Sequence, residues 1–269
     1  LDKKLPILII CQGSGYDSNT KGFLRIASKF SEQVAGLVIE KQGVKYGDKG
    51  DSLTQEYKDH NVVYNRVYDY LRVLQYLRAN AGWWNGDVYV VGGSEGGLLA
   101  GMIASFYPGV KGLGILCYGG GLKFGEAWPV SSGMQVKSDG GDSLAVKKEE
   151  AATRDTLELA RLNANFIQSY NNEDNTYAWW ASSTDLRLSN SLVDLKIPIF
   201  VAQGTEDMMA LPASAQKLQK VFLERKKYNL QYKEYIGYDH GFRDKESKSH
   251  LGEVLTEAIT WILNDPKIH

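Results

Sequence analysis

The sequence predicts an α/β protein in which a mostly parallel β-sheet carries helices on both faces. Six short runs rich in apolar and β-branched residues recur along the 269-residue chain. Several of these runs are apolar throughout, which is typical of strands that are covered on both faces. Segments with helical periodicity separate most of the runs, and strands that alternate with helices in this way pair in parallel.

The predicted strands share a continuous apolar character and a boundary of glycine or polar residues. In chain order they are LPILIICQ, AGLVIEKQ, DVYVVGG, VKGLGILCYGG, IPIFVAQG and LQYKEYIG. The predicted helices cover residues 61–79, 97–106, 211–226 and 251–264. The first and last carry an apolar stripe on one side, the second is almost wholly apolar and therefore buried, and the third has Pro212 in its first turn.

Between about Leu122 and Asp194 the alternation of strand and helix stops. FGEAWPVSSGMQ and KSDGGDS have the composition of loops, and residues 144–170 predict a long helix with charge on its exposed side. We therefore expect an α/β core made of residues 1–121 and 195–269. Residues 122–194 are expected to form an inserted lid or cap over one edge of the sheet.

The composition excludes several classes of protein. The formal net charge is -1, from 31 Lys and Arg against 32 Asp and Glu, so there is no electrostatic case for binding nucleic acid or an anionic membrane. No cluster of Cys and His has the spacing of zinc ligands, and we expect no metal. Cys11 and Cys117 each end an apolar run and are expected to be buried, unpaired thiols. No apolar stretch reaches the roughly 18 residues of a membrane-spanning helix.

The chain begins at Leu1 and enters a predicted strand almost at once. We expect that something upstream was removed or left out, such as a signal peptide, a tag or early strands. This favours an exported protein over a cytoplasmic one. The oligomeric state cannot be predicted from the sequence.

The stretch VYVVGGSEGGLLAGM contains G-x-S-x-G between a predicted strand and a predicted helix. A serine on so sharp a turn requires residues without a Cβ two positions before and after it, here Gly92 and Gly96. Such a turn holds the serine Oγ above the sheet, at the start of a helix whose free N–H groups stabilise negative charge. The pattern predicts that Ser94 is a nucleophile; a tight turn with a capping hydroxyl is the structural alternative.

A serine nucleophile needs a base and an acid that orients the base. Of the four histidines, His240 is the candidate base, because it follows a predicted strand in YIGYDHGF, downstream of the serine. QGTEDMM, at the end of another strand, offers Glu206 and Asp207, and we select Asp207. Asp239 is a poorer candidate, because side chains of adjacent residues rarely face each other.

The first strand ends in QGSG, a loop whose backbone N–H groups are suited to an anion. A dinucleotide-binding fingerprint is one interpretation, with Gly13 and Gly15 as its first glycines and Glu40 as the distant acid. Ser18 stands where that fingerprint requires its third glycine, and the serine, histidine and aspartate motifs would then have no role. The loop is therefore assigned to an oxyanion rather than to a cofactor phosphate.

Together these motifs resemble the α/β-hydrolase superfamily, whose triad follows the order nucleophile, acid, histidine. QGSG, GGSEGG, QGTED and DHGF carry the resemblance, which covers the chain outside the insertion and is closest to dienelactone-hydrolase-like and prolyl-oligopeptidase-like catalytic domains. The resemblance implies an oxyanion hole formed by the backbone N–H groups of Ser14 and Glu95. The sequence departs from the family in having Gln12 where histidine is frequent, and in lacking the antiparallel strands that usually open the fold.

The resemblance implies a serine hydrolase that acts on an ester, thioester or amide of a small or medium acyl or peptidyl substrate, without a cofactor. A carboxylic ester is favoured. An acyltransferase that uses the same triad and a non-catalytic binding domain with this fold are the alternatives. Specificity is expected in the insertion and in KQGVKYGDKGD after the second strand, where Lys41 and Lys45 attract an acidic substrate or are simply solvated. The aromatic residues of the insertion line a pocket or pack the lid onto the sheet; they are Trp128, Tyr177, Trp179 and Trp180.

Overall fold

The fold was analysed in a computed structural model, which describes residues 3–51, 53–166 and 175–264. Within these residues, six strands form one sheet in the order β2-β1-β3-β4-β5-β6, and every neighbouring pair is parallel. This confirms the predicted fold class. The strands are β1 (Leu5–Cys11), β2 (Ala35–Leu37), β3 (Trp84–Gly93), β4 (Val110–Leu116), β5 (Ile199–Gly204) and β6 (Leu230–Tyr235).

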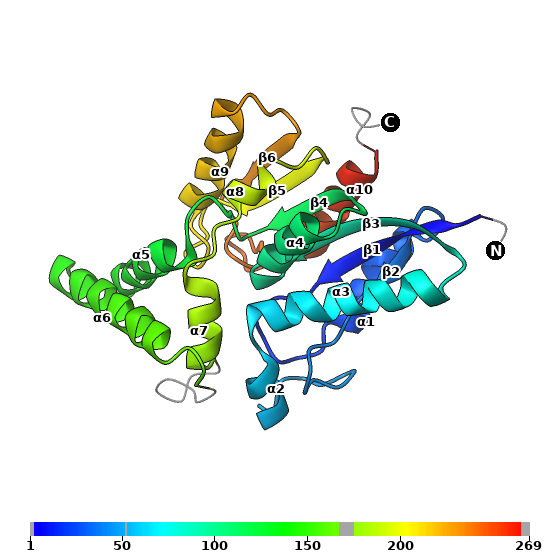
Figure 1. Ribbon diagram of the computed structural model, residues 1–269. Coiled ribbons are helices and arrows are strands. Elements are labelled where there is room, and N and C mark those ends of the chain that lie inside the picture. Colours follow the sequence, from blue (N-terminus) through cyan, green and yellow to red (C-terminus); the bar gives the residue numbers. More distant parts are fainter. Residues whose placement is uncertain (1–2, 52, 167–174, 265–269) are drawn as a thin grey trace.

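Helices cover both faces of the sheet (Figure 1). Helices α3, α4 and α9 pack on one face, whereas α1 and α10 pack on the other. The helices are α1 (Thr20–Ala27), α2 (Gln55–His60), α3 (Val63–Asn80), α4 (Glu95–Phe106), α5 (Phe124–Ser138), α6 (Ser143–Leu162), α7 (Tyr177–Thr184), α8 (Ser189–Leu192), α9 (Pro212–Glu224) and α10 (Leu251–Asn264), and one 3₁₀ turn, η1, spans Ser28–Phe30.

The apolar strands supply two hydrophobic cores because successive side chains of a strand point to opposite faces. In β1, Ile7 and Ile9 belong to the core beneath α3 and α4, whereas Leu8 and Ile10 belong to the core beneath α10. All four side chains are buried. This two-sided burial explains why the strand is apolar at every position instead of alternating with polar residues.

The segment between β4 and β5 contains α5, α6, α7 and α8. Figure 1 shows α5, α6 and α7 grouped beside the sheet, beyond the carboxyl ends of its strands. The prediction of a loop for FGEAWPVSSGMQ was wrong, because α5 extends through this stretch with Pro129 inside the helix. Packing against α6 accounts for this helix: a Cβ on Gly133 would touch Val146 and Glu150 of α6. Helix α6 forms most of the helix predicted over 144–170, but it ends at Leu162, and residues 163–166 are not helical. The last four residues of the prediction lie outside the described residues.

The second predicted strand is shorter than its apolar run. Ladder pairing with β1 covers only Ala35–Leu37. Beyond it, the carbonyl of Ile39 accepts a hydrogen bond from the side chain of Gln12 rather than from a strand. Residues 38–42 therefore leave the sheet and lie over the loop that follows β1.

Both cysteines are buried and unpaired, as predicted. Burial raises the pKa of Cys11 to about 12. Among the described residues, no helix is long and apolar enough to cross a bilayer, and no group of His, Cys, Asp and Glu is arranged to hold a metal ion.

Candidate active site

Ser94 lies on the turn between β3 and α4, at the carboxyl edge of the sheet. Its φ is 55° and its ψ is -130°, a conformation that side-chain-bearing residues rarely adopt. The glycines around it are required by contact: a Cβ on Gly92 would overlap the carbonyl of Gly96, and a Cβ on Gly96 would overlap the carbonyl of Cys11. The spacing G-x-S-x-G therefore follows from backbone packing at this turn.

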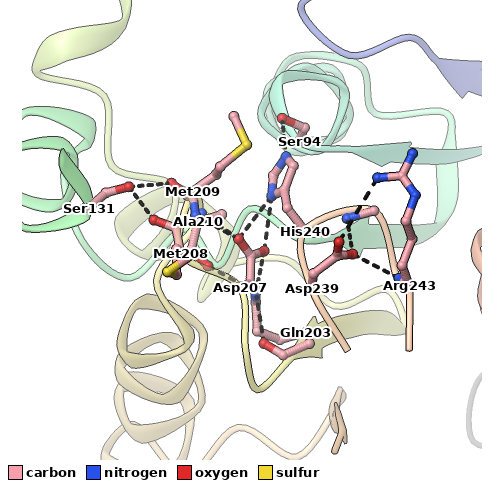
Figure 2. Close-up of polar contacts among 12 residues, drawn as sticks. Ser94, Ser131, Gln203, Asp207, Met208, Met209, Ala210, Asp239, His240 and Arg243 are labelled. Atoms are coloured by element: carbon pink, nitrogen blue, oxygen red, sulfur yellow. Dashed lines mark hydrogen bonds and ion pairs between the residues drawn. The ribbon is translucent and has the colours of Figure 1, made fainter. Parts of the chain in front are cut away.

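The imidazole of His240 lies between Ser94 and Asp207 (Figure 2). Its Nε2 is 3.0 Å from the Oγ of Ser94, and its Nδ1 is 3.0 Å from each carboxylate oxygen of Asp207. The His240 side chain is 22% exposed, whereas the Asp207 side chain is fully buried. The structure thus brings together the three residues that the sequence selected, from loops after three different strands.

The Asp207 carboxylate is held by backbone and side-chain donors besides His240. The N–H groups of Met209 and Ala210 donate to Oδ1 at 2.9 and 2.8 Å, and the Gln203 amide donates to Oδ2 at 2.8 Å. These donors fix the carboxylate and stabilise its negative charge in a buried site. The hydroxyl of Ser131 in α5 contacts the Met208 carbonyl of the same loop (Figure 2).

The other candidate acids and histidines have different surroundings. Glu206 is exposed, and Asp239 accepts N–H bonds from Gly241 and Arg243, which closes the turn that carries His240. His250 pairs with Asp244 and Glu253. His60 ends α2, and His269 lies outside the described residues.

The QGSG loop passes beside the serine turn. A Cβ on Gly13 would lie 3.5 Å from the Gly93 carbonyl and 3.7 Å from the Cβ of Ser94. Ser14, Ser94 and Glu95 line the same cavity. Within the described part of the chain, the backbone N–H groups of Ser14 and Glu95 donate no hydrogen bond, so both remain able to bind an anion. Neither Ser14 nor Ser18 caps the following helix: the residue before α1 is Asn19, and Ser18 bonds to Glu40 instead.

A buried ion pair beneath this loop was not anticipated from the sequence. Arg66 of α3 lies 2.8 Å from the Glu95 carboxylate and donates to the Gln12 carbonyl at 2.7 Å. Trp179 of α7 donates its indole N–H to the same Glu95 oxygen at 3.2 Å. One signal was available: Arg66 stands three residues after Val63 and one before Val67, within the apolar side of its helix.

The interpretation of Lys41 as a surface residue was wrong. Its side chain is 7% exposed, and its ammonium group donates to the carbonyls of Ser14, at 3.4 Å, and Gly15. Burial, with a smaller contribution from Arg66, lowers its pKa to about 7. Lys41 thus holds the QGSG loop rather than attracting substrate, whereas Lys45 is exposed.

A cavity of about 490 Å³ opens beside Ser94 and His240. Its walls combine the end of the sheet with helices α5 and α7. Trp128, Trp179 and Trp180 line it, and Trp179 and Trp180 also pack with Phe124 at ring-centroid distances of 5.9 and 5.8 Å. Trp128, Trp179 and Trp180 therefore line a pocket, as one interpretation expected, whereas Tyr177 does not. The aromatic cluster packs α5, α6 and α7 against one another rather than onto the sheet.

Comparisons with known proteins identify the fold. No family model matches the sequence, and no curated protein matches it. Among solved structures, the chain is similar to Est1E from Butyrivibrio proteoclasticus with bound ferulic acid, at 17% identity and a TM-score of 0.61 over 95% of this chain and 87% of that one.

Two further solved structures are also similar to nearly the whole of this chain. A monoacylglycerol lipase from Paleococcus ferrophilus matches at 16% identity and a TM-score of 0.61, over 97% of this chain and 96% of that one. MGS-M2, an α/β hydrolase from a Medee basin deep-sea metagenome, matches at 15% identity and a TM-score of 0.59, over 100% and 93%. The chain has the α/β-hydrolase fold, as the sequence motifs predicted.

Proposed function

We propose that this chain is a serine hydrolase that cleaves carboxylic esters of small or medium acids through an acyl-enzyme on Ser94. The proposal rests on the contacts of the His240 ring. Its Nε2 lies 3.0 Å from Ser94 Oγ, and its Nδ1 lies 3.0 Å from each oxygen of the Asp207 carboxylate. A hydroxyl, an imidazole and a buried carboxylate in this order form the arrangement that activates a serine.

In the first half of the proposed reaction, Ser94 Oγ attacks the ester carbonyl carbon while His240 Nε2 takes the hydroxyl proton. A tetrahedral oxyanion forms, and Asp207 stabilises the imidazolium. When the intermediate collapses, the bond to the alcohol oxygen breaks and His240 returns the proton to that oxygen. The alcohol leaves, and the acyl group remains bonded to Ser94.

In the second half, a water molecule replaces the alcohol. His240 accepts one water proton while the water oxygen attacks the acyl carbon, and the same proton then returns to Ser94 Oγ as its bond to carbon breaks. The products are one carboxylic acid and one alcohol for each ester and water consumed. The proposed oxyanion donors are the N–H groups of Ser14 and Glu95, each contributing roughly 3–4 kcal/mol to the transition state.

The cavity and the structural neighbours support an ester with an apolar, ring-sized acyl group. Three tryptophans line a space of about 490 Å³ next to Ser94. One neighbour is a lipase, and Est1E binds ferulic acid, an aromatic carboxylic acid. In this proposal, residues 122–194 act as a cap that supplies the aromatic wall through α5 and α7.

Labelling with a fluorophosphonate probe tests the proposal. The probe reacts only with a serine whose proton a neighbouring base removes, so we expect one adduct, mapped by mass spectrometry to Ser94 and absent from Ser94→Ala. Hydrolysis of a 4-nitrophenyl ester should disappear in the same variant. Folded protein that gives neither an adduct nor ester hydrolysis would overturn the proposed function.

A further inference from the structure

Three buried side chains bind four consecutive backbone carbonyls of the loop that follows β1. The four carbonyls are those of Gln12, Gly13, Ser14 and Gly15. Arg66 of α3 donates to the first two, at 2.7 and 3.4 Å. The hydroxyl of Tyr57 donates to the third at 3.0 Å, and the ammonium group of Lys41 donates to the third, at 3.4 Å, and to the fourth. Each of four successive peptide planes is therefore held by a side-chain donor.

These contacts also fix the direction of the backbone N–H groups. In a trans peptide the carbonyl of one residue and the N–H of the next point in opposite directions, and no described peptide is cis. Arg66 binds the Gly13 carbonyl from the side of α3, so the N–H of Ser14 points away from α3. Tyr57 and Lys41 bind the peptide on the other side of Ser14. The proposed oxyanion donor thus lies between two fixed peptide planes.

The loop needs such contacts because glycine stands on both sides of Ser14. Peptides next to Gly13 and Gly15 rotate at little steric cost, since glycine occupies positive and negative φ alike. Rotation of the peptide before Ser14 would turn a carbonyl oxygen, instead of the N–H, toward the oxyanion and repel it. Rotation of the peptide after Ser14 would release the residue for the same change. Side chains that bind the carbonyls oppose both rotations.

Lys41 and Tyr57 reach the loop as one packed unit. The N–H of Val44 donates to the carbonyl of Lys41 at 2.9 Å, and Gly43 in this turn has a φ of 80°. A Cβ on Gly43 would overlap the backbone nitrogen of Tyr57, so the turn packs directly on the start of α2. Thr54 accepts a hydrogen bond from the Tyr57 N–H and donates one to the Gly43 carbonyl, both at 3.1 Å. This packing accounts for the polar stretch KQGVKYGDKGD at its first four residues.

The burial of Lys41 indicates a role that an apolar side chain could not fill. Its side chain is 7% exposed, and within the described part of the chain it forms no ion pair. Burial, and then the charge of Arg66, lower its pKa to about 7. An apolar residue of similar length would avoid the cost of burying an ammonium group, but it would supply no donor to the loop. Charged groups buried at such a cost are typical of functional sites.

We propose that Lys41 and Tyr57 are positioning residues, which together with Arg66 keep the Ser14 N–H directed at the oxyanion of the reaction. This inference rests on the proposed function, because it assigns the side chains to the oxyanion hole of that same site. None of the three lines the cavity, so none touches the substrate. Their removal should therefore weaken binding of the transition state and leave binding of the ester unchanged.

Steady-state kinetics on a 4-nitrophenyl ester test this role. Tyr57→Phe and Lys41→Met should each lower kcat about tenfold, which is part of the roughly 10²–10³-fold loss caused by removing an oxyanion donor. KM should stay within about twofold, because both acyl-transfer steps pass through an oxyanion and slow together. Tyr107→Phe and Lys49→Met are the matched controls. The buried hydroxyl of Tyr107 has no partner among the described residues and Lys49 is exposed, so kcat should stay within about twofold.

Two inhibitors of the same shape distinguish a misdirected N–H from a deformed cavity. When a phenylalkyl trifluoromethyl ketone binds, Ser94 Oγ adds to its carbonyl carbon, the serine proton passes to His240, and the carbonyl oxygen becomes an oxyanion. The alcohol obtained by reducing this ketone has no carbonyl and forms no adduct. In Tyr57→Phe and Lys41→Met, the inhibition constant of the ketone should rise about tenfold and that of the alcohol should stay within about twofold. An equal rise for both inhibitors would mean a deformed cavity and would overturn the proposal.

The peptide between Ser14 and Gly15 reports on the loop without any activity. The sequence contains two Ser–Gly pairs, Ser14–Gly15 and Ser132–Gly133. Protein with carbon-13 in the serine carbonyls and nitrogen-15 in glycine therefore gives one NMR signal for each pair. Tyr57→Phe and Lys41→Met should broaden or split the first signal, because the peptide then adopts more than one orientation. The second signal, from α5, should remain sharp.

The outcomes separate this inference from the proposed function. If the wild type hydrolyses the ester and both variants keep its kcat, the positioning role is overturned and the proposed function stands. If no ester is hydrolysed but the Ser14–Gly15 signal alone broadens in both variants, the side chains hold the loop as proposed and the proposed function fails. A Ser14–Gly15 signal that stays sharp in both variants overturns the inference at any level of activity.

Discussion

The guanidinium of Arg66 lies 2.8 Å from the carboxylate of Glu95, and both side chains are about 95% buried. The same guanidinium donates to the carbonyls of Gln12, at 2.7 Å, and Gly13, at 3.4 Å. Arg66 therefore contacts the residue after Ser94 and the two residues before Ser14. Since Ser14 and Glu95 are the proposed oxyanion donors, one side chain from α3 fixes the spacing between them.

Removing Arg66 should destabilise the protein strongly. In Arg66→Met the carboxylate of Glu95 stays buried without its charge partner, and such a loss costs about 3–5 kcal/mol of the free energy of unfolding. The double variant Arg66→Met/Glu95→Gln removes both charges, so its cost should be about 1–3 kcal/mol less than the sum of the two single variants. Urea unfolding of the four proteins measures this coupling. Additive costs would show that the ion pair does not act as a unit.

The choice between the two acids in QGTEDMM gives a second prediction. Asp207→Asn should lower kcat for an ester about 10⁴-fold, because an amide cannot stabilise the imidazolium or hold the productive tautomer of His240. Glu206→Gln is the control, since Glu206 is adjacent in the chain but exposed, and its kcat should stay within about twofold. Steady-state kinetics on one ester measures both variants. Equal losses, or a loss below tenfold in Asp207→Asn, would contradict the assignment of Asp207.

The parts of the site that local backbone geometry dictates were predictable from the sequence. Gly92 and Gly96 are required by the turn that holds Ser94, so the turn is visible as a motif. The order of the loops after successive strands then pointed to Asp207 and His240. By contrast, the preference for Asp207 over Glu206 depends on which side chain turns inward, and only the structure shows that Asp207 is buried.

Features that depend on contacts between distant segments were not predictable. Helix α5 contains Gly125, Pro129 and Gly133, whose low helix propensity favoured a loop, but packing against α6 overrides that propensity. Lys41 follows a strand in a polar stretch, and nothing local indicates that its ammonium group turns inward to the QGSG loop. The hydrogen bond from Trp179 to Glu95 joins residues 84 positions apart in the sequence, so it could not be inferred without the fold.

Substitution of the second glycine of the serine turn gives a third prediction. In Gly96→Ala the new methyl group would overlap the carbonyl of Cys11, a backbone atom that cannot move without disturbing β1. We expect a cost of about 1–3 kcal/mol in the free energy of unfolding, as for overpacking elsewhere, and a loss of fluorophosphonate labelling. Gly82→Ala is the matched control, because nothing lies within 4 Å of its added Cβ and its φ is not positive, so it should change stability by less than about 0.5 kcal/mol. Comparable unfolding midpoints for the two variants would contradict the role of Gly96.

The pH dependence of stability supplies a fourth prediction, which concerns His250. Its Nε2 lies 2.8 Å from Asp244 and its Nδ1 lies 2.8 Å from Glu253, and its ring stacks on Tyr238 at 4.9 Å. Hydrogen bonding to Asp244, and then to Glu253, raises the pKa of His250 above its usual value of 6.5. The folded state therefore keeps a proton on His250 over a pH range in which the unfolded state releases it. The resulting gain in the free energy of unfolding is fully present below pH 6.5 and is lost as the pH rises through the higher pKa of the folded state. At low pH, hydrogen bonding to His250 lowers the pKa values of Asp244 and Glu253. Their contribution to the free energy of unfolding is therefore lost only as the pH falls through these lowered pKa values.

Urea unfolding between pH 5 and pH 9 of the wild type and of His250→Gln measures this linkage. We expect the variant to be less stable than the wild type near pH 5.5, and the difference between them to shrink as the pH rises towards 9, because neutral histidine no longer forms the ion pair. His60→Gln is the control for the loss of an exposed imidazole elsewhere in the chain, at the end of α2. The loop closed by His250 also carries His240, and the backbone N–H of His250 donates to the carbonyl of Phe242 at 2.8 Å. A difference between the wild type and His250→Gln that is constant across the pH range would mean that His250 acts through packing alone and not through its charge.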